Sequence, residues 1–241
     1  MSEEPIRITY FIISFIFHCI IAYYIIKTAR KTKLNQLYLL ATHVFLEGFL
    51  QIIMAIQGPY GEVGWFYFIE ILVLVVFMKW GFYKEQRSIS AYVVIVISIV
   101  NYIIYIPLIV LQISLAIRRF IIDIIMITLG SWFLYVSLSA YLKIRSVKGI
   151  EPWIKARYVL VMIYGFLWAL SGVFLMIPGP TTELSPLILL TMLLYIIIPV
   201  TEYLAWVMPE RFKNWLNRNY TYEEETGELS EEEIMKSFGG D

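Results

Sequence analysis

Long apolar runs separated by short polar segments dominate the chain from residue 8 to residue 207. A bilayer core of about 30 Å needs about 20 apolar residues in a helix, and backbone polar groups cannot stay unpaired in lipid. We therefore expect each run to be a membrane-spanning helix, and the fold to be an all-α, polytopic seven-transmembrane-helix bundle. The predicted spans are residues 8–26, 37–56, 63–82, 89–111, 120–142, 158–177 and 187–207.

Prolines and turn residues separate several of these runs. Pro59, Pro180 and Pro186 fall between spans, as expected for a residue without an N–H group. Pro107 lies within the fourth run, where it could end or kink the helix, and the apolar stretch continues to Ile117. The acidic N-terminus carries no cleavage site of small residues, so the first run is expected to be a true span and not a signal peptide.

Lys and Arg residues are concentrated in alternate loops, and in membrane proteins the loops rich in these residues are cytoplasmic. Sixteen of the 19 basic residues lie at or between the ends of spans one and two, three and four, and five and six, or after span seven. The remaining three are Arg7, Arg118 and Arg119. We therefore expect a multi-pass protein of the cell membrane with its N-terminus outside and its C-terminus in the cytoplasm.

The pattern divides the chain into a membrane domain at 1–208, an interfacial amphipathic helix at 209–219 and an acidic cytoplasmic tail at 220–241. Phe212, Trp215 and Leu216 have helical spacing in the second segment, with basic residues elsewhere on the turn. This pattern is typical of a helix that lies on the inner membrane face. The tail is rich in Glu, which is typical of a solvated disordered segment, but it could also dock a cytosolic protein.

Two segments of similar sequence suggest an internal repeat. Ile56 begins a segment of the form I-x-G-P-x-x-E after span two, and Ile177 begins the same form after span six, 121 residues later. If this similarity reflects a true repeat, spans one to three and spans five to seven are parallel repeats, and span four is the linker between them. This arrangement is known among transporters. Chance matching of apolar segments is the alternative.

This three-one-three layout resembles that of sugar-exporting SWEET proteins and of microbial rhodopsins. The resemblance is one of architecture alone. The Pro-Gln pair of the SWEET-related families is absent, and span seven has no lysine to which retinal could attach.

Ionisable and polar side chains interrupt the predicted spans, and each is a candidate functional residue because a charge near a span's centre costs at least about 2.5–3.5 kcal/mol. His43, Glu47 and Gln51 are spaced four apart and share one stripe of span two, which should face the bundle interior. The predicted ligand or ion cavity is lined by His43, Glu47, Glu70, His18, Asn101 and Asp123, and the predicted inner gate consists of Lys79, Pro199 and Glu202.

Most candidates also have a purely structural interpretation. A His and a carboxylate four residues apart can bind a cation or transfer a proton. They can also pair with each other, so that neither polar group is left unpaired in the membrane. Glu70 has no basic residue one turn away, so it either faces a wet cavity or is a protonated packing residue. Asp123 follows Arg119 by four residues and could form a local ion pair. Glu202 could pair with Lys79 near the inner end.

Three further features of the predicted spans allow a functional or a structural interpretation. Pro199 interrupts the helical hydrogen bonding of span seven and could form a moving gate, although prolines are common in transmembrane helices. Asn101 could hydrogen-bond across helices. Gly165, Ala169 and Gly172 form a small-residue stripe on span six that should allow close helix packing.

Two functions fit this pattern. The first is a receptor-like sensor that binds a small ligand or cation in an outward-facing polar cavity and relays the change to a partner. The alternative is a small-solute or proton-coupled transporter, and a structural factor without a ligand is a third. No nucleophile motif or H-E-x-x-H is present, so we expect no enzyme. Cys19 is the single cysteine, which excludes an internal disulfide and a multi-cysteine metal site. His18 and His43 lie at similar depth on adjacent spans and could in principle ligate a haem or a metal, but we expect no metal site and no cofactor. The dispersed basic residues predict no nucleic-acid partner.

Overall fold

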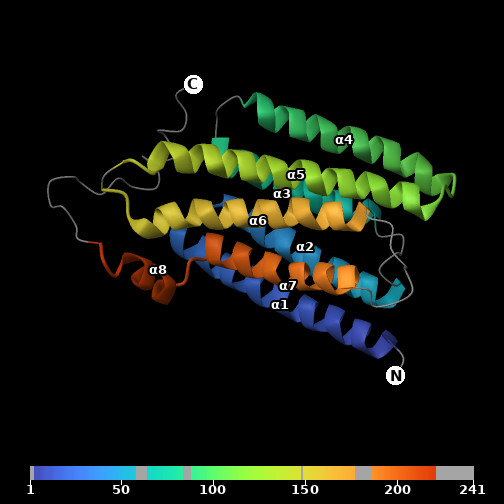
Figure 1. Ribbon diagram of the computed structural model, residues 1–241, viewed down its shortest axis with the longest axis horizontal. Helices are drawn as coiled ribbons and strands as arrows, with labels where there is room; N and C mark the ends of the chain where they lie inside the picture. The colour runs from blue at the N-terminus through green and yellow to red at the C-terminus, as the bar shows by residue number, and fades with distance from the viewer. Residues whose placement is uncertain (1–2, 58–63, 84–87, 148, 177–185, 221–241) are drawn as a thin grey trace.

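The computed structural model describes residues 3–57, 64–83, 88–147, 149–176 and 186–220, and the regular structure in these residues is helical (Figure 1). Seven helices of 20 to 30 residues are followed by a short one of 8 residues. They are α1 (Glu3–Thr32), α2 (Gln36–Gln57), α3 (Gly64–Tyr83), α4 (Ile89–Val110), α5 (Leu115–Ile144), α6 (Pro152–Met176), α7 (Pro186–Trp206) and α8 (Glu210–Asn217).

Five of the described helices are long and apolar enough to cross a membrane, which confirms the all-helical, membrane-compatible class. They are α1, α2, α4, α5 and α6. In α7 the described apolar stretch is Ile196–Trp206. Pro107 lies inside α4 and does not end it; the helix continues to Val110.

The long helices contact one another in chain order, and α1 also contacts α7, so they form a closed ring of neighbours (Figure 1). The rings of Tyr24 on α1 and Tyr203 on α7 are 5.9 Å apart at this closure. Phe77 of α3 and Trp206 of α7 meet edge to face at 4.8 Å. This closure brings side chains from α1, α2, α3, α6 and α7 into one interior.

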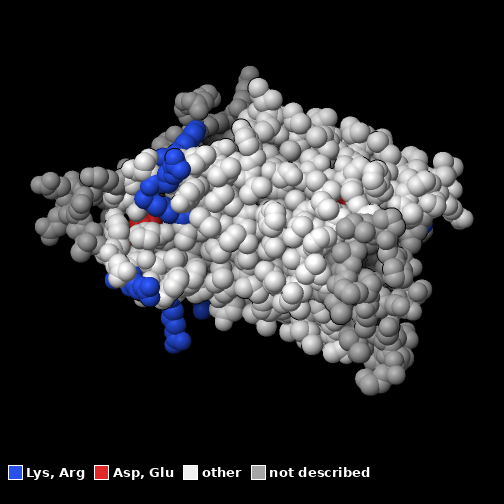
Figure 2. Space-filling view, in the orientation of Figure 1, with Lys and Arg blue, Asp and Glu red and all other residues white. Residues whose placement is uncertain are grey.

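The distribution of polar side chains is the reverse of that in a soluble protein. Large apolar side chains such as Ile13, Ile103 and Tyr135 are about three-fifths exposed, whereas His43, Glu70 and other ionisable groups are buried. Burying charge while exposing hydrocarbon is favourable only where the surroundings are lipid. Figure 2 shows the middle of the visible surface almost free of charge, with most of its Lys and Arg at the end where α8 lies.

Close packing of α5 and α6 depends on glycine. A Cβ at Gly165 would lie 2.7 Å from the carbonyl oxygen of Gly130, and one at Gly130 would lie 2.4 Å from the backbone nitrogen of Ala169. A Cβ at Gly172 would lie 3.0 Å from the carbonyl oxygen of Asp123 on α5. The small-residue stripe predicted on span six is therefore confirmed as a helix-packing surface.

The predicted amphipathic segment forms α8, which is attached to the start of α6. The Asn217 side chain accepts a hydrogen bond from the backbone N–H of Trp153 at 3.4 Å and donates one to Glu151. The Lys213 ammonium lies 4.2 Å from the centre of the Trp153 ring. The acidic tail, with its predicted docking role, lies outside the described residues.

Candidate functional site

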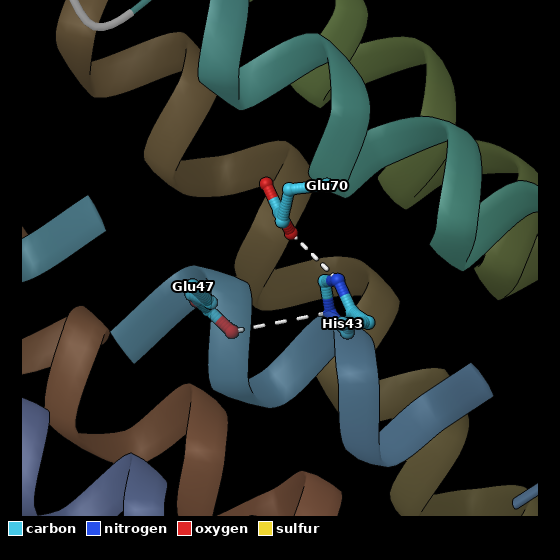
Figure 3. Close-up of side chains that lie close together, drawn as sticks. All are labelled: His43, Glu47 and Glu70. Carbon is cyan, nitrogen blue, oxygen red and sulfur yellow. Dashed lines mark ion pairs between the residues drawn. The ribbon is translucent and has the colours of Figure 1, made fainter. Parts of the chain in front are cut away.

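His43 lies at the centre of a group of buried polar side chains. Its Nδ1 is 2.6 Å from Oε1 of Glu70 on α3, an ion pair by distance whose atoms are not aligned as a hydrogen bond. Its Nε2 faces the other way, 3.3 Å from the hydroxyl of Tyr164 on α6, 3.8 Å from Oε1 of Glu202 on α7 and 3.9 Å from Oε2 of Glu47. Figure 3 shows the imidazole between two of these carboxylates, Glu47 and Glu70.

His18 joins this group from α1. Its Nδ1 is 2.7 Å from the carbonyl oxygen of Ser14. A carbonyl oxygen only accepts, so this nitrogen carries the hydrogen and donates it. The other ring nitrogen, Nε2, lies 3.6 Å from Oε2 of Glu47. Gly48 allows this approach, since a Cβ there would lie 2.7 Å from Cβ of His18.

We call this group the His43 cluster, and its members come from five helices of the ring. Every member is buried, and His43, Glu70 and Glu202 have no exposed surface. The predicted interior stripe of span two is also buried along its described length, from His43 through Glu47 to Gln51. The cluster consists of His18, His43, Glu47, Glu70, Tyr164 and Glu202.

The cluster contains more acidic than basic groups. It has three carboxyls and two imidazoles, and no Lys or Arg is among the described ion-pair partners of these five groups. Even with both imidazoles protonated, three ionised carboxylates leave an excess negative charge. An unbalanced charge buried away from water is strongly disfavoured. The cluster therefore needs at least one further proton or cation to be neutral.

Several polar atoms of the cluster have no hydrogen-bond partner among the described residues. Both carboxylate oxygens of Glu70 and of Glu202 are in this state, as are Oε2 of Glu47 and Nε2 of His18. Buried polar atoms are nearly always paired with protein, ordered water or an ion. Imidazole nitrogens and carboxylate oxygens bind both protons and cations, so this arrangement has the chemistry of a cation- or proton-binding site.

The structure does not show the expected pair of Glu202 with Lys79. Glu202 approaches His43, and the Lys79 ammonium lies 4.8 Å from the centre of the Tyr92 ring on α4. Lys79 belongs near the membrane surface, and its long side chain reaches an aromatic face there instead of the interior. Pro199 lies inside α7, buried, three residues before Glu202.

Two predicted cavity residues are not among the described contacts of the cluster. Asn101 is half-buried and donates a hydrogen bond to the carbonyl of Ile97 in its own helix at 2.8 Å. Asp123 is buried on α5. The side chain of Arg119, its predicted partner, lies outside the described residues.

Tyr164 is the member of the cluster that sequence reasoning missed. Tyrosine carries no charge at neutral pH, so it does not stand out in an apolar span. A signal was present, however, because Tyr164 follows His43 by 121 residues, the same offset that separates the two I-x-G-P-x-x-E segments.

The chain matches no protein-family model, no curated protein and no solved structure. Any assignment of a function to the chain therefore rests on the geometry of the cluster.

Proposed function

We propose that this chain is a seven-span membrane protein that binds a small cation, a proton included, at the His43 cluster and carries it across the bilayer. The observation that carries the proposal is a buried imidazole, His43, approached by Glu47, Glu70 and Glu202, with no Lys or Arg among the described ion-pair partners of these groups. Intramembrane ionisable groups of this kind mark ion pathways and proton relays.

The position of the cluster favours a carrier. His43 of α2 meets Tyr164 of α6 and Glu202 of α7, so the cluster lies between the first three and the last three long helices. In transporters built from repeated halves, the substrate site lies near the membrane midplane between the halves. The 121-residue separation of His43 and Tyr164 matches the register of the three-one-three repeat that we propose.

The size of the site favours an ion over a larger solute. His43, Glu70 and Glu202 are sealed from the surface, and the described contacts between them are 2.6 and 3.8 Å long. Such spacing accommodates a proton or a single metal ion without moving helices apart. The outward-facing cavity that we expected to bind a small ligand or cation has no comparable support.

Movement of α7 is the step that would expose the site. Pro199 removes one backbone donor inside this helix, within one turn of Glu202. Helix-breaking prolines are tolerated in membranes where the chain bends around a binding site. Binding a cation between Glu202 and His43 would change the attraction of α7 for α2, and so favour one position of the helix.

We further propose that the end of the bundle bearing α8 is cytoplasmic. Lys143, Arg145 and Lys155 lie at this end, together with Lys213 of α8. Cytoplasmic ends of membrane bundles carry the excess of Lys and Arg. The N-terminus of α1 lies at the opposite end and would be outside the cell (Figure 1).

A receptor-like sensor is the second candidate, and the attachment of α8 supports it. Asn217 and Lys213 tie α8 to Glu151 and Trp153 at the start of α6. A shift of α7 would therefore be transmitted to α8 and the start of α6, and α8 precedes the acidic tail in the sequence. In this reading, cation binding at the cluster changes the affinity of the tail for a cytosolic protein.

Purified protein in sealed vesicles tests the carrier. A proton, Na⁺ or divalent-metal gradient should drive flux above that of protein-free vesicles, and Glu202→Gln should abolish it. Glu210→Gln, an exposed carboxyl on α8, is the matched control and should leave flux intact. Flux equal to that of protein-free vesicles for each of these cations would contradict the carrier.

Truncation after Arg218 separates the two candidates. A carrier keeps its flux without the tail, because the cluster lies within α1 to α7. A sensor that signals through its tail keeps cation binding but loses its output.

A further inference from the structure

We infer that the His43 cluster is a binding site for a divalent first-row transition-metal ion, of the Zn²⁺ class. This rests on the cation-binding function proposed above and names the kind of cation. The ligands are His18 and His43 through Nε2, and Glu47 and Glu202 through carboxylate oxygens. Glu70 is a positioning residue that orients His43.

The two imidazoles are arranged in the way that metal-binding histidines require. A histidine that binds a metal through one nitrogen donates the other N–H to a carboxylate or a backbone carbonyl. Nδ1 of His18 is directed to the carbonyl of Ser14, and Nδ1 of His43 lies beside Glu70. Both Nε2 atoms then face the same oxygen, Oε2 of Glu47, at 3.6 and 3.9 Å.

Three of the six pairs among the four ligand atoms are described, and their spacing is close to that around one tetrahedral ion. Metal–ligand bonds of about 2.0–2.2 Å place neighbouring ligand atoms roughly 3.3–3.6 Å apart. The observed separations are 3.6 Å between His18 and Glu47, 3.9 Å between His43 and Glu47, and 3.8 Å between His43 and Glu202. Side-chain movements of a few tenths of an ångström bring these three pairs to metal-binding distance, and closing the other pairs around one ion requires the four side chains to converge.

Glu70 does not fit a place among the ligands, although His43, Glu47 and Glu70 have ligand atoms within 4.8 Å of one another. Its Oε1 lies 2.6 Å from Nδ1 of His43, closer than two ligands of one tetrahedral ion approach each other. Glu70 faces Nδ1 of His43, whereas Glu47 lies toward the other nitrogen, Nε2 (Figure 3). Glu202 also faces Nε2. Glu70 is therefore placed to form a carboxylate–histidine–metal arrangement with His43 once the two atoms align as a hydrogen bond.

The ligand atoms point to the class of metal. Two imidazole nitrogens and two carboxylate oxygens suit Zn²⁺, Co²⁺, Fe²⁺ or Mn²⁺, whereas Ca²⁺ and Mg²⁺ prefer oxygen ligands alone. Cu⁺ prefers sulfur, and none of the four ligands carries sulfur. Two ionised carboxylates balance the charge of one divalent ion, so the third carboxyl, Glu70, must hold a proton for the cluster to be neutral. Glu202, whose two oxygens have no hydrogen-bond partner among the described residues, is directed into the site.

The remaining neighbours are compatible with an ion at this place. The hydroxyl of Tyr164 lies 3.3 Å from Nε2 of His43, so it competes for this nitrogen and must turn away when a metal binds. Tyr10 of α1 and Tyr67 of α3 lie within electrostatic reach of Glu47 and Tyr164, respectively. Both are neutral hydroxyl groups that add no charge to the site.

Titration of the full-length protein in detergent with Co²⁺ tests the assignment. The wild-type chain should bind one Co²⁺ with the intense visible absorption of a tetrahedral site, and Zn²⁺ should displace it. Glu202→Gln and His43→Gln should weaken Co²⁺ binding by at least about 100-fold, and Glu70→Gln by about 10–100-fold with the shape of the spectrum kept. Glu210→Gln should bind as the wild type does.

A variant that gains a spectroscopic band separates a change of ligand from a loss of folding. His18→Cys should retain Co²⁺ and add a thiolate-to-cobalt charge-transfer band in the near ultraviolet, which the wild type, with its natural Cys19, should lack. Absence of that band in a chain that still binds Co²⁺, or Co²⁺ binding unchanged by Glu202→Gln and His43→Gln, overturns the ligand assignment. Proton or Na⁺ flux without any Co²⁺ binding overturns the metal assignment alone, and leaves the proposed carrier standing.

Discussion

Oε1 of Glu202 on α7 lies 3.8 Å from Nε2 of His43 on α2, and neither side chain is exposed. This pairing directs the acid of α7 into the bundle, while Lys79 turns to the ring of Tyr92. It leaves the interior with a surplus of carboxyl groups. That surplus, and not any single residue, is the reason to regard the interior as a cation site.

His43→Leu should be the most destabilising substitution in the cluster. The leucine leaves Glu47, Glu70 and Glu202 facing one another without the imidazole between them. Breaking a buried charged pair by removing one partner costs about 3–5 kcal/mol. Unfolding in mixed micelles with increasing SDS should show a loss of this size in the free energy of unfolding.

Two milder substitutions serve as controls for that measurement. Glu202→Gln removes one carboxyl from a cluster that has a surplus, so it should cost no more than about 1 kcal/mol. Asn101→Ala removes a hydrogen bond within α4, 2.8 Å long and remote from the described contacts of the cluster, and should cost about 1 kcal/mol. Equal losses for His43→Leu and Asn101→Ala would show that the cluster is not the electrostatic centre of the bundle.

Gly48→Ala should separate α1 from α2 at the site. Its Cβ would lie 2.7 Å from Cβ of His18, and overpacking of this kind costs about 1–3 kcal/mol. Since His18 must move, cation binding should weaken as well.

Gly81→Ala in α3 is the matched control for that substitution. Among the described residues its Cβ would meet only Cζ of Phe77, at 3.9 Å, so the gain in helix propensity should stabilise the protein by about 0.5–1 kcal/mol. The same thermal or SDS unfolding measurement checks both. Equal behaviour of the two alanine variants would contradict the close approach of α1 and α2.

Pro199→Ala should separate binding from transport. Restoring the missing backbone donor should raise the free energy of unfolding, by no more than the roughly 3 kcal/mol that a helix-interior proline costs. Cation binding should remain, because Glu202 and His43 are unchanged, while flux into vesicles should fall. Flux equal to that of the wild type would argue against a hinge in α7.

Cysteine labelling tests the orientation. Ser114, which makes no side-chain cap hydrogen bond at the start of α5, and Ser146, beyond its end, are both exposed. In a Cys19→Ser background, Ser114→Cys should react with an impermeant maleimide on intact cells. Ser146→Cys should react only after permeabilisation. The opposite pattern would place α8 outside the cell.

The helices could be predicted closely because lipid leaves the backbone few alternatives. Each predicted span lies within one residue of a helix or inside it, and the extra length falls in polar flanks, such as residues 152–157 of α6. The interior stripe of His43, Glu47 and Gln51 followed from helical spacing and the cost of placing charge in lipid.

Contacts between helices far apart in the chain could not be predicted in the same way. Depths estimated at about 1.5 Å per residue from the outer ends of the predicted spans put Glu70 roughly 10 Å nearer the outer surface than His43, yet the two side chains meet at 2.6 Å. Those estimates assumed untilted helices, and tilt and side-chain reach remove such differences. The partner of Glu202 depended on the closure of the ring between α1 and α7, which no local pattern encodes.

Charge displacement in a supported membrane is the most direct test that the cluster binds a cation. Vesicles carrying the wild-type protein, adsorbed on an electrode, should give a transient current when the concentration of protons, Na⁺ or Zn²⁺ is raised, because an ion entering a buried site moves charge across part of the bilayer. The current should vanish in the Glu47→Gln/Glu70→Gln double variant and persist in Glu210→Gln. A current of equal size in the double variant, or none in the wild type for any of these cations, would contradict the account.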